Sequence, residues 1–484
     1  MLAESGIVAG SQPIGRVGQA AAIAEVARRA AFVAFSIAVV MSPFRAAVLL
    51  AAQPRPPLYA GYTDFSVSWA EIAALAALVL WGIALVAERR PITAGPRILW
   101  IPALALVALG WASAIWSVDA PLSLENAAEL TLLAAFGLYV INEVRLERVP
   151  ILVAGAVAVQ SIVALGQVAL QRSLGLSWLG ELQLDPAVRG VSVVATSDSD
   201  RLLRAYGLAD HPNILGGILA FSLPLLAGGL IRNAKRSRRS DRAIVGALAA
   251  TFVLVSAALF VSFSRGAWLA AAAALLVGLV MLVRSRSDDG LKSLSPLRAL
   301  GLAVAGAGVV VIALAIVDAR FALVRADVLN PRVSTEAMSA GERAILMRVA
   351  LDAIAAQPLL GTGLATSAMA VLSAMPSLDF DSQPAAVAIL DVAVELGLVG
   401  AACYLALVAA PWLTLARRSI PWTPWLIATS AALLAWAIVG LFDYYTWSFP
   451  AGQIWTVLLF AFWAIAVRDA RATHPEAAAS AAHG

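Results

Sequence analysis

Long runs of apolar residues are the feature that most limits how this chain can fold. About twelve of them follow one another, and most approach the ~20 residues that an α-helix needs to cross a bilayer. Charged residues make up 13% of the 484 residues, whereas a soluble domain carries roughly 25%. We therefore predict an all-α polytopic membrane protein with about twelve transmembrane helices. The runs lie near residues 30–50, 68–87, 98–116, 126–142, 150–170, 214–231, 243–263, 267–283, 299–317, 386–416, 422–442 and 453–467.

The residue types that several other classes of site require are scarce. Cys403 is the only cysteine and lies inside an apolar run, so neither a disulfide within the chain nor a cysteine-based metal site is expected. Of the three histidines, His474 and His483 lie in a polar, alanine-rich C-terminal tail, and His211 stands alone. The formal net charge of +4 is spread over short clusters between apolar runs. We expect no metal, no cofactor and no nucleic-acid partner.

Arginine and lysine are concentrated in alternate connections between the apolar runs. Because basic connections stay on the cytoplasmic side of a membrane, both termini are predicted to be cytoplasmic. Residues 1–29 and 468–484 would then be tails flanking a transmembrane domain of residues 30–467. The loops at about 172–213 and 318–385 would lie outside. The basic connections are near residues 88–97, 143–149, 232–242, 284–298 and 417–418.

The second outer loop contains a predicted helix over residues 341–356. Its apolar residues include Ile345, Val349 and Ala353, which recur at the spacing of one helix face. Pro358 follows two residues after the end, as expected of a residue that cannot continue a helix. We expect this loop to form a partly helical external cap over the membrane domain.

The first outer loop ends in a segment that can cap a helix or bind an anion. It reads Arg204-Ala-Tyr-Gly-Leu-Ala-Asp210-His211-Pro212-Asn213 and is followed by an apolar run. Pro212 suits the first turn of a helix, and Asp210 or His211 can cap it. One interpretation is a simple helix start with an arginine at the membrane interface. The other is an anion site, because a helix N-terminus and an arginine both favour phosphate.

A single arginine separates two apolar runs at Ser264-Arg265-Gly266. An arginine at membrane depth is costly, so it normally faces a cavity and has a function. Gly266 would permit a tight turn or the close approach of a ligand. The alternative is that Arg265 extends its side chain from a helix end to the interface. We prefer the functional interpretation.

Three further charged residues are ambiguous when each is taken singly. Arg343, beside Glu342, is either a solvated charge on the predicted cap helix or part of a site. Asp391 and Glu395 lie four residues apart in an apolar run and so share one helix face. Acidic residues there are costly unless they are paired. They either face an external cavity or close a polar contact within the bundle.

Four motifs follow one another along the chain. They are Arg204-x-x-Gly207 with His211-Pro-Asn213, Ser264-Arg265-Gly266, Arg343 with Pro358-x-x-Gly361-x-Gly363, and Glu395-x-Gly397-x-x-Gly400. Taken in order, these motifs resemble the O-antigen ligase superfamily, which includes O-antigen ligases and polymerases, over roughly residues 65–465.

The resemblance implies transfer of a glycan from an undecaprenyl-pyrophosphate carrier to a saccharide or lipid acceptor, at the outer face of a bacterial cytoplasmic membrane. Arginines matching Arg204 and Arg265 would hold the carrier's pyrophosphate, and we group Arg343 with them as substrate-binding.

One departure from the family pattern concerns the residue that activates the acceptor. Ligases of this family usually carry His-Asn at the outer start of the helix that bears the two acidic residues, where this chain has Ala386 and Val387. If the protein is an enzyme, we predict that Asp391 is the base, with His211 or Asp381 as the other candidates. A further alternative is that the reaction relies mostly on stabilisation of the leaving group. The alternatives are a transporter of a lipid-linked glycan or small solute on the same scaffold, or a catalytically inactive scaffold.

Overall fold

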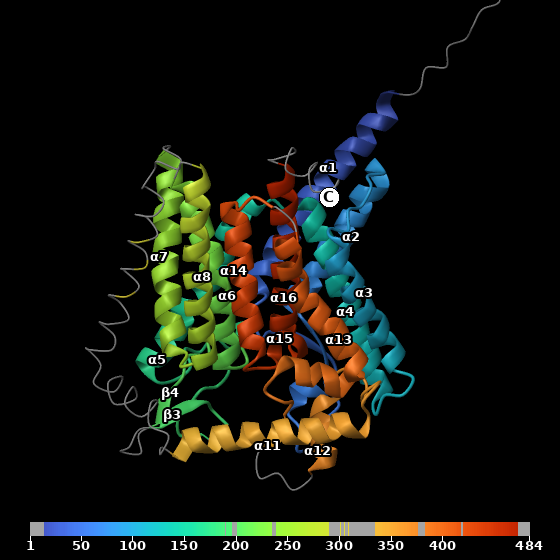
Figure 1. The fold of residues 1–484 in the computed structure, drawn as a ribbon, viewed down its shortest axis with the longest axis vertical. Coiled ribbons are helices and arrows are strands. Elements are labelled where there is room, and N and C mark those ends of the chain that lie inside the picture. The colour runs from blue at the N-terminus through green and yellow to red at the C-terminus, as the bar shows by residue number, and fades with distance from the viewer. Residues whose placement is uncertain are drawn as a thin grey trace, which may run out of the picture.

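The computed structural model describes residues 14–188, 190–195, 201–234, 239–289, 301, 304, 308, 334–375, 383–417 and 420–472. Long helices stand side by side in a bundle, and one helix, α11, lies across an end of it (Figure 1). The long helices are α1 (Ile14–Met41), α2 (Trp69–Glu88), α3 (Arg97–Ser113), α4 (Ala120–Glu143), α5 (Val149–Leu170), α6 (Pro212–Asn233), α7 (Arg239–Val261), α8 (Arg265–Asp289), α11 (Ser334–Ala356), α13 (Ala388–Arg417), α14 (Pro424–Gly440) and α16 (Pro450–Ala472). The short ones are α12 (Ser367–Ala374), α15 (Tyr445–Ser448) and the 3-10 helices η1 (Ala60–Tyr62), η2 (Leu146–Arg148) and η3 (Ser177–Leu179).

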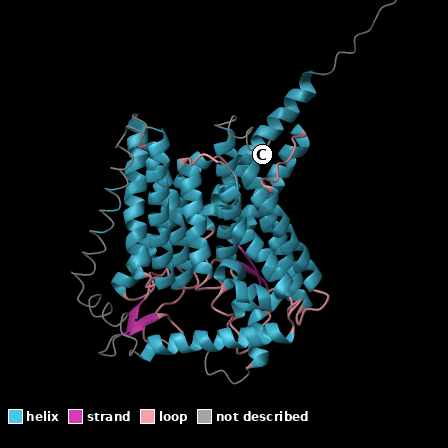
Figure 2. Cartoon of the chain, viewed as in Figure 1, coloured by secondary structure: helices cyan, strands magenta, loops and turns pink. Residues whose placement is uncertain are grey.

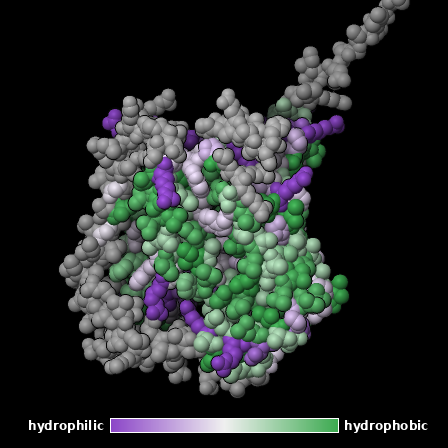
Figure 3. All heavy atoms as spheres, in the orientation of Figure 1, coloured by the Kyte–Doolittle hydropathy of each residue, from purple (hydrophilic) through white to green (hydrophobic). Residues whose placement is uncertain are grey.

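Eight of the described helices are long and apolar enough to cross a membrane. Two more apolar helices, α3 and α14, have 17 residues each. Apolar side chains form a belt around the middle of the visible face, and hydrophilic ones lie toward its two ends (Figure 3). The expectation of a largely helical chain with many potential membrane spans is confirmed. The count of about twelve stays a prediction, because the run at 299–317 lies almost entirely outside the described residues.

Helix α6 forms the centre of one half of the bundle. It contacts α5, α7, α8 and α14, and its apolar span is buried along its whole length. Small residues permit this close packing. A Cβ atom added to Gly228 would lie 2.6 Å from the Cβ of Ala428 in α14, and one added to Gly229 would lie 2.6 Å from the Cβ of Pro150 in α5. The N-terminus of α6, which carries His211 and Asn213, is therefore held in a fixed position.

Two short antiparallel hairpins add strands that the all-α prediction did not include (Figure 2). In the first, β1 (Ala47–Ala51) pairs with β2 (Phe65–Ser68) so that Ala47 faces Ser68. In the second, β3 (Val193–Ala195) pairs with β4 (Arg201–Leu203) so that Val193 faces Leu203. Strands of three to five residues are too short to show a clear alternation of apolar and polar residues.

Helix α1 begins well before the first predicted membrane span. Arg28 and Arg29, expected in a tail, lie within the helix. Arg28 pairs with Glu88 at the end of α2, and the Nε of Arg29 lies 2.7 Å from a carboxylate oxygen of Glu25. These ion pairs let the helix continue through charged residues. The domain boundary at residue 30 stays a prediction.

The helix predicted in the second long loop is present as α11. It ends at Ala356, as the following proline indicated, and starts at Ser334. Leu346, Val349 and Ala350 are buried on the side that packs against α12 and α13. Ile345 is 39% exposed, so the buried stripe is shifted from the predicted one. That this helix lies outside the membrane as a cap stays a prediction.

Candidate functional site

Arg204 follows β4 and holds three separate parts of the fold together. Its Nε donates to the carbonyl oxygen of Ser262 at 2.9 Å, and one terminal nitrogen donates to the Oγ of Ser192 at 2.9 Å. The other terminal nitrogen donates to the Oδ1 of Asn213 at 2.7 Å and to the carbonyl oxygen of Phe263 at 3.3 Å. Arg204 is half-buried. It therefore fixes the turn between α7 and α8 against the start of α6.

That turn presents Arg265 at the surface. Phe263 has a left-handed backbone (φ 49°), Arg265 begins α8, and its side chain is exposed. A Cβ atom added to Gly266 would lie 3.1 Å from the Cβ of Phe442, so the turn packs against the end of α14. Since Arg204 binds the carbonyl groups of Ser262 and Phe263, Arg204 and Arg265 lie in one region. A common cavity for both arginines stays a prediction.

The start of α6 connects this region to Asp443. The Nδ2 of Asn213 donates to a carboxylate oxygen of Asp443 at 2.9 Å. Burial raises the pKa of Asp443, while the positive charge of Arg343 opposes that shift. Arg343 is exposed on α11 and lies within electrostatic range of both Asp443 and His211. The structure thus gathers the predicted residues Arg204, Arg343 and His211 around an aspartate that the motifs did not include.

His211 caps α6. Its Nδ1 accepts the backbone N–H of Asn213 at 3.2 Å. Burial, together with the positive charges of Arg204 and Arg343, lowers the pKa of His211 to about 3. The ring is therefore neutral near pH 7. Because Nδ1 acts as an acceptor, the proton of the neutral ring is assigned to Nε2.

Asp391 and Glu395 both point toward the short helix α15. Ser448 donates its hydroxyl to the Oδ2 of Asp391, and the Nε1 of Trp447 donates to the Oε2 of Glu395 at 2.9 Å. Ser367 in α12 also hydrogen-bonds to Asp391 through its side chain. Both acidic side chains are buried. The prediction that they share one helix face is confirmed. The Oδ1 of Asp391 has no hydrogen-bond partner among the described residues.

The glycine motifs form a single backbone junction. Helix α13 is broken at Gly397, where φ is 66°. The N–H of Gly363 donates to the carbonyl oxygen of Glu395 at 2.9 Å, and the N–H of Leu398 donates to that of Pro358 at 2.8 Å. A Cβ atom on Gly397 would lie 2.2 Å from the carbonyl oxygen of Leu359. The two motifs that follow α11 and open α13 therefore interlock, and they set the position of the acidic residues.

One short segment, Asp443 to Ser448, joins the arginine region to the acidic residues. At its start, Asp443 accepts the hydrogen bond from Asn213, which in turn binds Arg204. At its end, Ser448 binds Asp391. This segment therefore contacts both groups directly. The sequence did contain a signal, since Asp443 is the only acidic residue between positions 396 and 468.

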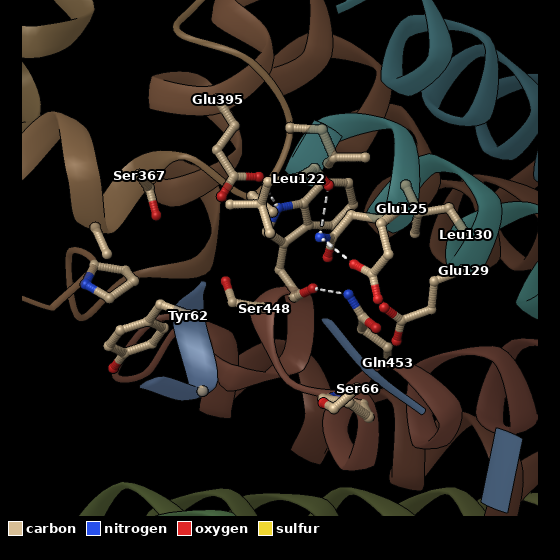
Figure 4. A pocket seen from close by; sticks show the side chains of 18 of the residues that line it. Tyr62, Ser66, Leu122, Glu125, Glu129, Leu130, Ser367, Glu395, Ser448 and Gln453 are labelled. Atoms are coloured by element: carbon tan, nitrogen blue, oxygen red, sulfur yellow. Dashed lines mark hydrogen bonds between the residues drawn. The ribbon is translucent and has the colours of Figure 1, made fainter. Parts of the chain in front are cut away.

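A polar cavity of about 70 Å³ opens beside Ser367 and Ser448 (Figure 4). Both serines bind Asp391, which lies behind them and does not itself line the cavity. This volume admits a few water molecules or one substituent of a sugar. Its lining brings together hydroxyl, amide and carboxyl groups from η1, α4, α12, α13 and α15–α16. The polar residues lining it are Tyr62, Asp64, Ser66, Glu125, Asn126, Glu129, Ser367, Glu395, Ser448 and Gln453.

The side chain of Tyr62 connects the cavity to the middle of the joining segment. Its hydroxyl lies 2.5 Å from that of Tyr444, next to Asp443. Burial raises the pKa of both tyrosines, so both keep their protons. Asp381, the remaining candidate base, lies outside the described residues. In the part of the chain that the structure describes, no group of three or more His, Cys, Asp or Glu residues could hold a metal ion.

Residues 250–405 match the family model described as O-antigen ligase. No curated protein matches the chain. The matched stretch contains Arg265, Arg343 and Asp391, whereas Arg204 and Asp443 lie on either side of it. The match confirms the resemblance drawn from the motifs.

Proposed function

From the membership of residues 250–405 in the O-antigen ligase family, we propose that this protein transfers a glycan from a polyprenyl-pyrophosphate carrier to a saccharide or lipid acceptor. The reaction would take place at the outer face of a bacterial cytoplasmic membrane. In it, an acceptor hydroxyl oxygen bonds to the anomeric carbon. The bond from that carbon to the pyrophosphate breaks, and the pyrophosphate leaves with the electron pair.

The observation that carries this proposal is the joining segment. A transferase of this kind must place positive charge at the leaving pyrophosphate and a proton acceptor near the incoming hydroxyl. Asp443 is tied through Asn213 to Arg204, and Ser448, five residues later, is tied to Asp391. One short backbone segment thus positions both the arginines proposed for the pyrophosphate and the carboxylate proposed for the acceptor hydroxyl.

The arginines would stabilise the pyrophosphate as its negative charge develops. Arg265 and Arg343 are exposed and would contact it directly. Arg204 binds the carbonyl groups of Ser262 and Phe263, so its contribution includes holding the turn that presents Arg265. Their planar guanidinium groups can bind phosphate oxygens in pairs.

Asp391 is the base in this proposal. Ser448 holds the Oδ2 atom, which orients the carboxylate. The Oδ1 atom is buried and without a partner among the described residues. It would take the proton of the acceptor hydroxyl once the acceptor has entered between Ser367 and Ser448, which separate it from the cavity. The adjoining polar cavity would bind hydroxyl groups of the acceptor, because its lining offers both hydrogen-bond donors and acceptors.

The test measures release of undecaprenyl pyrophosphate by the purified protein in lipid vesicles that contain donor and acceptor. We expect Arg265→Lys to lower the rate by at least about tenfold, because an ammonium group lacks the paired donors of arginine. The matched control is Arg284→Lys, at the other end of α8, which should keep the wild-type rate. Equal rates for wild type and Arg265→Lys would contradict the pyrophosphate role.

The same assay distinguishes the proposed transferase from a transporter and from an inactive scaffold. Ser448 and Ser367 bind Asp391 as they would in a purely structural polar contact. This observation favours the two alternatives that need no catalytic base, a transporter and an inactive scaffold. Flux of the lipid-linked glycan without release of the carrier pyrophosphate would identify a transporter. Neither flux nor release would identify an inactive scaffold.

A further inference from the structure

The end of the bundle farthest from α11 contains a hollow of about 520 Å³ lined with arginines. The two ends of helix α6 show where the hollow lies. His211 caps the start of α6 near Arg343 of α11, whereas Arg232, which lines the hollow, lies in the last turn of α6. We propose that this hollow binds the phosphate headgroup of an anionic phospholipid. Its volume is in the range of small-ligand sites. The lining residues are Val144, Arg145, Glu147, Arg148, Arg232, Arg468 and Asp469.

Two of the four arginines are already balanced by acidic residues. A terminal nitrogen of Arg232 lies 2.8 Å from a carboxylate oxygen of Glu147. The Nε of Arg468 lies 3.2 Å from Asp469, and another nitrogen of Arg468 donates to the carbonyl oxygen of Ile141 at 2.8 Å. These contacts fix the walls of the hollow and use up both acidic residues that line it.

The other two arginines leave positive charge in the hollow. Arg145 and Arg148 are exposed, and neither has an ion-pair partner among the described residues. The guanidinium carbon of Arg148 lies 4.7 Å from the centre of the Phe32 ring, a contact that orients the group and leaves its charge without an anion. The N-terminus of α5, which follows directly, also favours an anion. A phosphate diester would complete this set of donors.

The depth of the hollow points to a lipid as the source of the phosphate. Four apolar spans begin or end at its lining residues or directly beside them, so it lies where headgroups meet the hydrocarbon layer. Ile151, in the first turn of α5, is 52% exposed and offers an apolar surface to an acyl chain. Basic pockets between helices on the cytoplasmic side are suited to anionic headgroups. The spans are Ala120–Glu143, Leu146–Leu170, Pro212–Asn233 and Pro450–Ala472.

The experiment titrates the full-length protein in detergent with phosphatidylglycerol and counts bound lipid by native mass spectrometry. Arg145→Gln removes an exposed side chain that has no ion pair to lose, so the fold should be unaffected. We expect this variant to bind phosphatidylglycerol about fivefold more weakly, and Arg145→Gln/Arg148→Gln at least about tenfold more weakly. Zwitterionic phosphatidylethanolamine should bind wild type and variants equally weakly.

The matched control is Arg89→Gln/Arg97→Gln, which removes the same charge from exposed arginines outside the hollow that have no ion-pair partner among the described residues. It should bind phosphatidylglycerol like the wild type. Unchanged binding by Arg145→Gln would overturn the proposal, as would an equal loss in the control. Displacement of the lipid by an equal concentration of glycerol 3-phosphate would also overturn it, because the ligand would then be a soluble phosphate. None of these outcomes depends on glycan transfer.

Discussion

At the scale of single residues, the two oxygens of Asp391 have different surroundings. Oδ2 accepts the hydroxyl of Ser448, and Oδ1 has no partner among the described residues. Asp391→Asn keeps an oxygen for Ser448 and removes the proton acceptor. We expect folded yield in membranes to be unchanged and glycan transfer to fall by roughly 10²-fold or more, as for loss of a general base.

Glu395→Gln, one turn along the same helix face, is the comparison for this variant. An amide oxygen can still accept the indole N–H of Trp447, but Glu395 also lines the polar cavity, so transfer should fall, though less than in Asp391→Asn. The matched control is Asp352→Asn, which removes an exposed carboxylate from α11 and should keep the wild-type rate. Full transfer by Asp391→Asn would exclude the catalytic role. Loss of folded protein with normal specific activity would assign Asp391 to structure.

His211 was the other predicted base, and its surroundings lead to a different expectation. Its Nδ1 is used as the cap of α6, and burial lowers its pKa to about 3. Asparagine also caps helices well. We therefore expect His211→Asn to keep most of the transfer activity, and activity between pH 5 and 8 to show no titration of His211. A loss of about 10²-fold or more, measured as carrier release, would instead make His211 the base.

The site residues could be predicted from the sequence only where a motif drew attention to them. Arg265 and Asp391 lie between or within apolar runs, where a charged side chain is costly unless it has a function, and Arg204 belongs to the segment that leads into an apolar run. The structure adds what spacing could not give, namely that Arg204 holds backbone carbonyl groups beside Arg265. Asp443 was missed because it belongs to no quoted motif, although it is isolated in the same way. Contacts across 230 residues, such as Asn213 with Asp443, depend on packing.

At the scale of elements, the interlocked glycine motifs predict that a side chain at Gly397 destabilises the fold. Gly397 has a φ of 66°, and its added Cβ would lie 2.2 Å from the carbonyl oxygen of Leu359. A backbone oxygen cannot move away like a flexible side chain. Strain from the left-handed conformation alone is of the order of 1–3 kcal/mol. Gly397→Ala should therefore lower the midpoint of thermal unfolding in detergent and reduce transfer, since the junction positions Glu395 and Asp391.

Helix α7 supplies the matched control for that substitution. A Cβ atom at Gly246 would have nothing within 4 Å, and alanine favours a helix over glycine by about 1 kcal/mol. Gly246→Ala should thus unfold at the wild-type temperature or slightly above. If Gly397→Ala unfolded at the same temperature as Gly246→Ala, the proposed junction would be wrong.

The sequence predicted long helices well and short helices and strands poorly, because only a long element contains enough residues to show a periodic pattern. Apolar runs of 17 residues or more became α2, α5 and α6 with only small shifts at their ends. The α11 helix was found from apolar spacing and the proline that follows it. By contrast, β3 and α15 have three and four residues, which is too few to produce a periodic pattern. Short elements nevertheless lie at the site, because β4, the partner strand of β3, leads into Arg204, and α15 carries Ser448.

At the scale of the whole molecule, the two ends of the bundle differ in the polar groups that they present. One end has α11, the joining segment and the polar cavity, while the other has the arginine-lined hollow. Alternating basic connections predict that the arginine-rich end faces the cytoplasm. The carrier pyrophosphate and the acceptor would then meet at the outer face of the cytoplasmic membrane, and the anionic lipid of the hollow would belong to the inner leaflet of that membrane.

This orientation can be tested by the accessibility of single cysteines. The variants Arg348→Cys, exposed on α11, and Arg90→Cys, exposed after α2, would be made in a Cys403→Ser background. In intact cells, with the outer membrane permeabilised if the cell has one, a maleimide that does not cross the cytoplasmic membrane should label residue 348 and should label residue 90 only after that membrane is opened. The physical reason is that arginine-rich connections are retained on the cytoplasmic side of the membrane. The loop that contains α11 is then placed on the opposite, outer side. Labelling of residue 90 in intact cells, with residue 348 protected, would invert the topology. It would place the candidate site in the cytoplasm, where a reaction at the outer face could not occur.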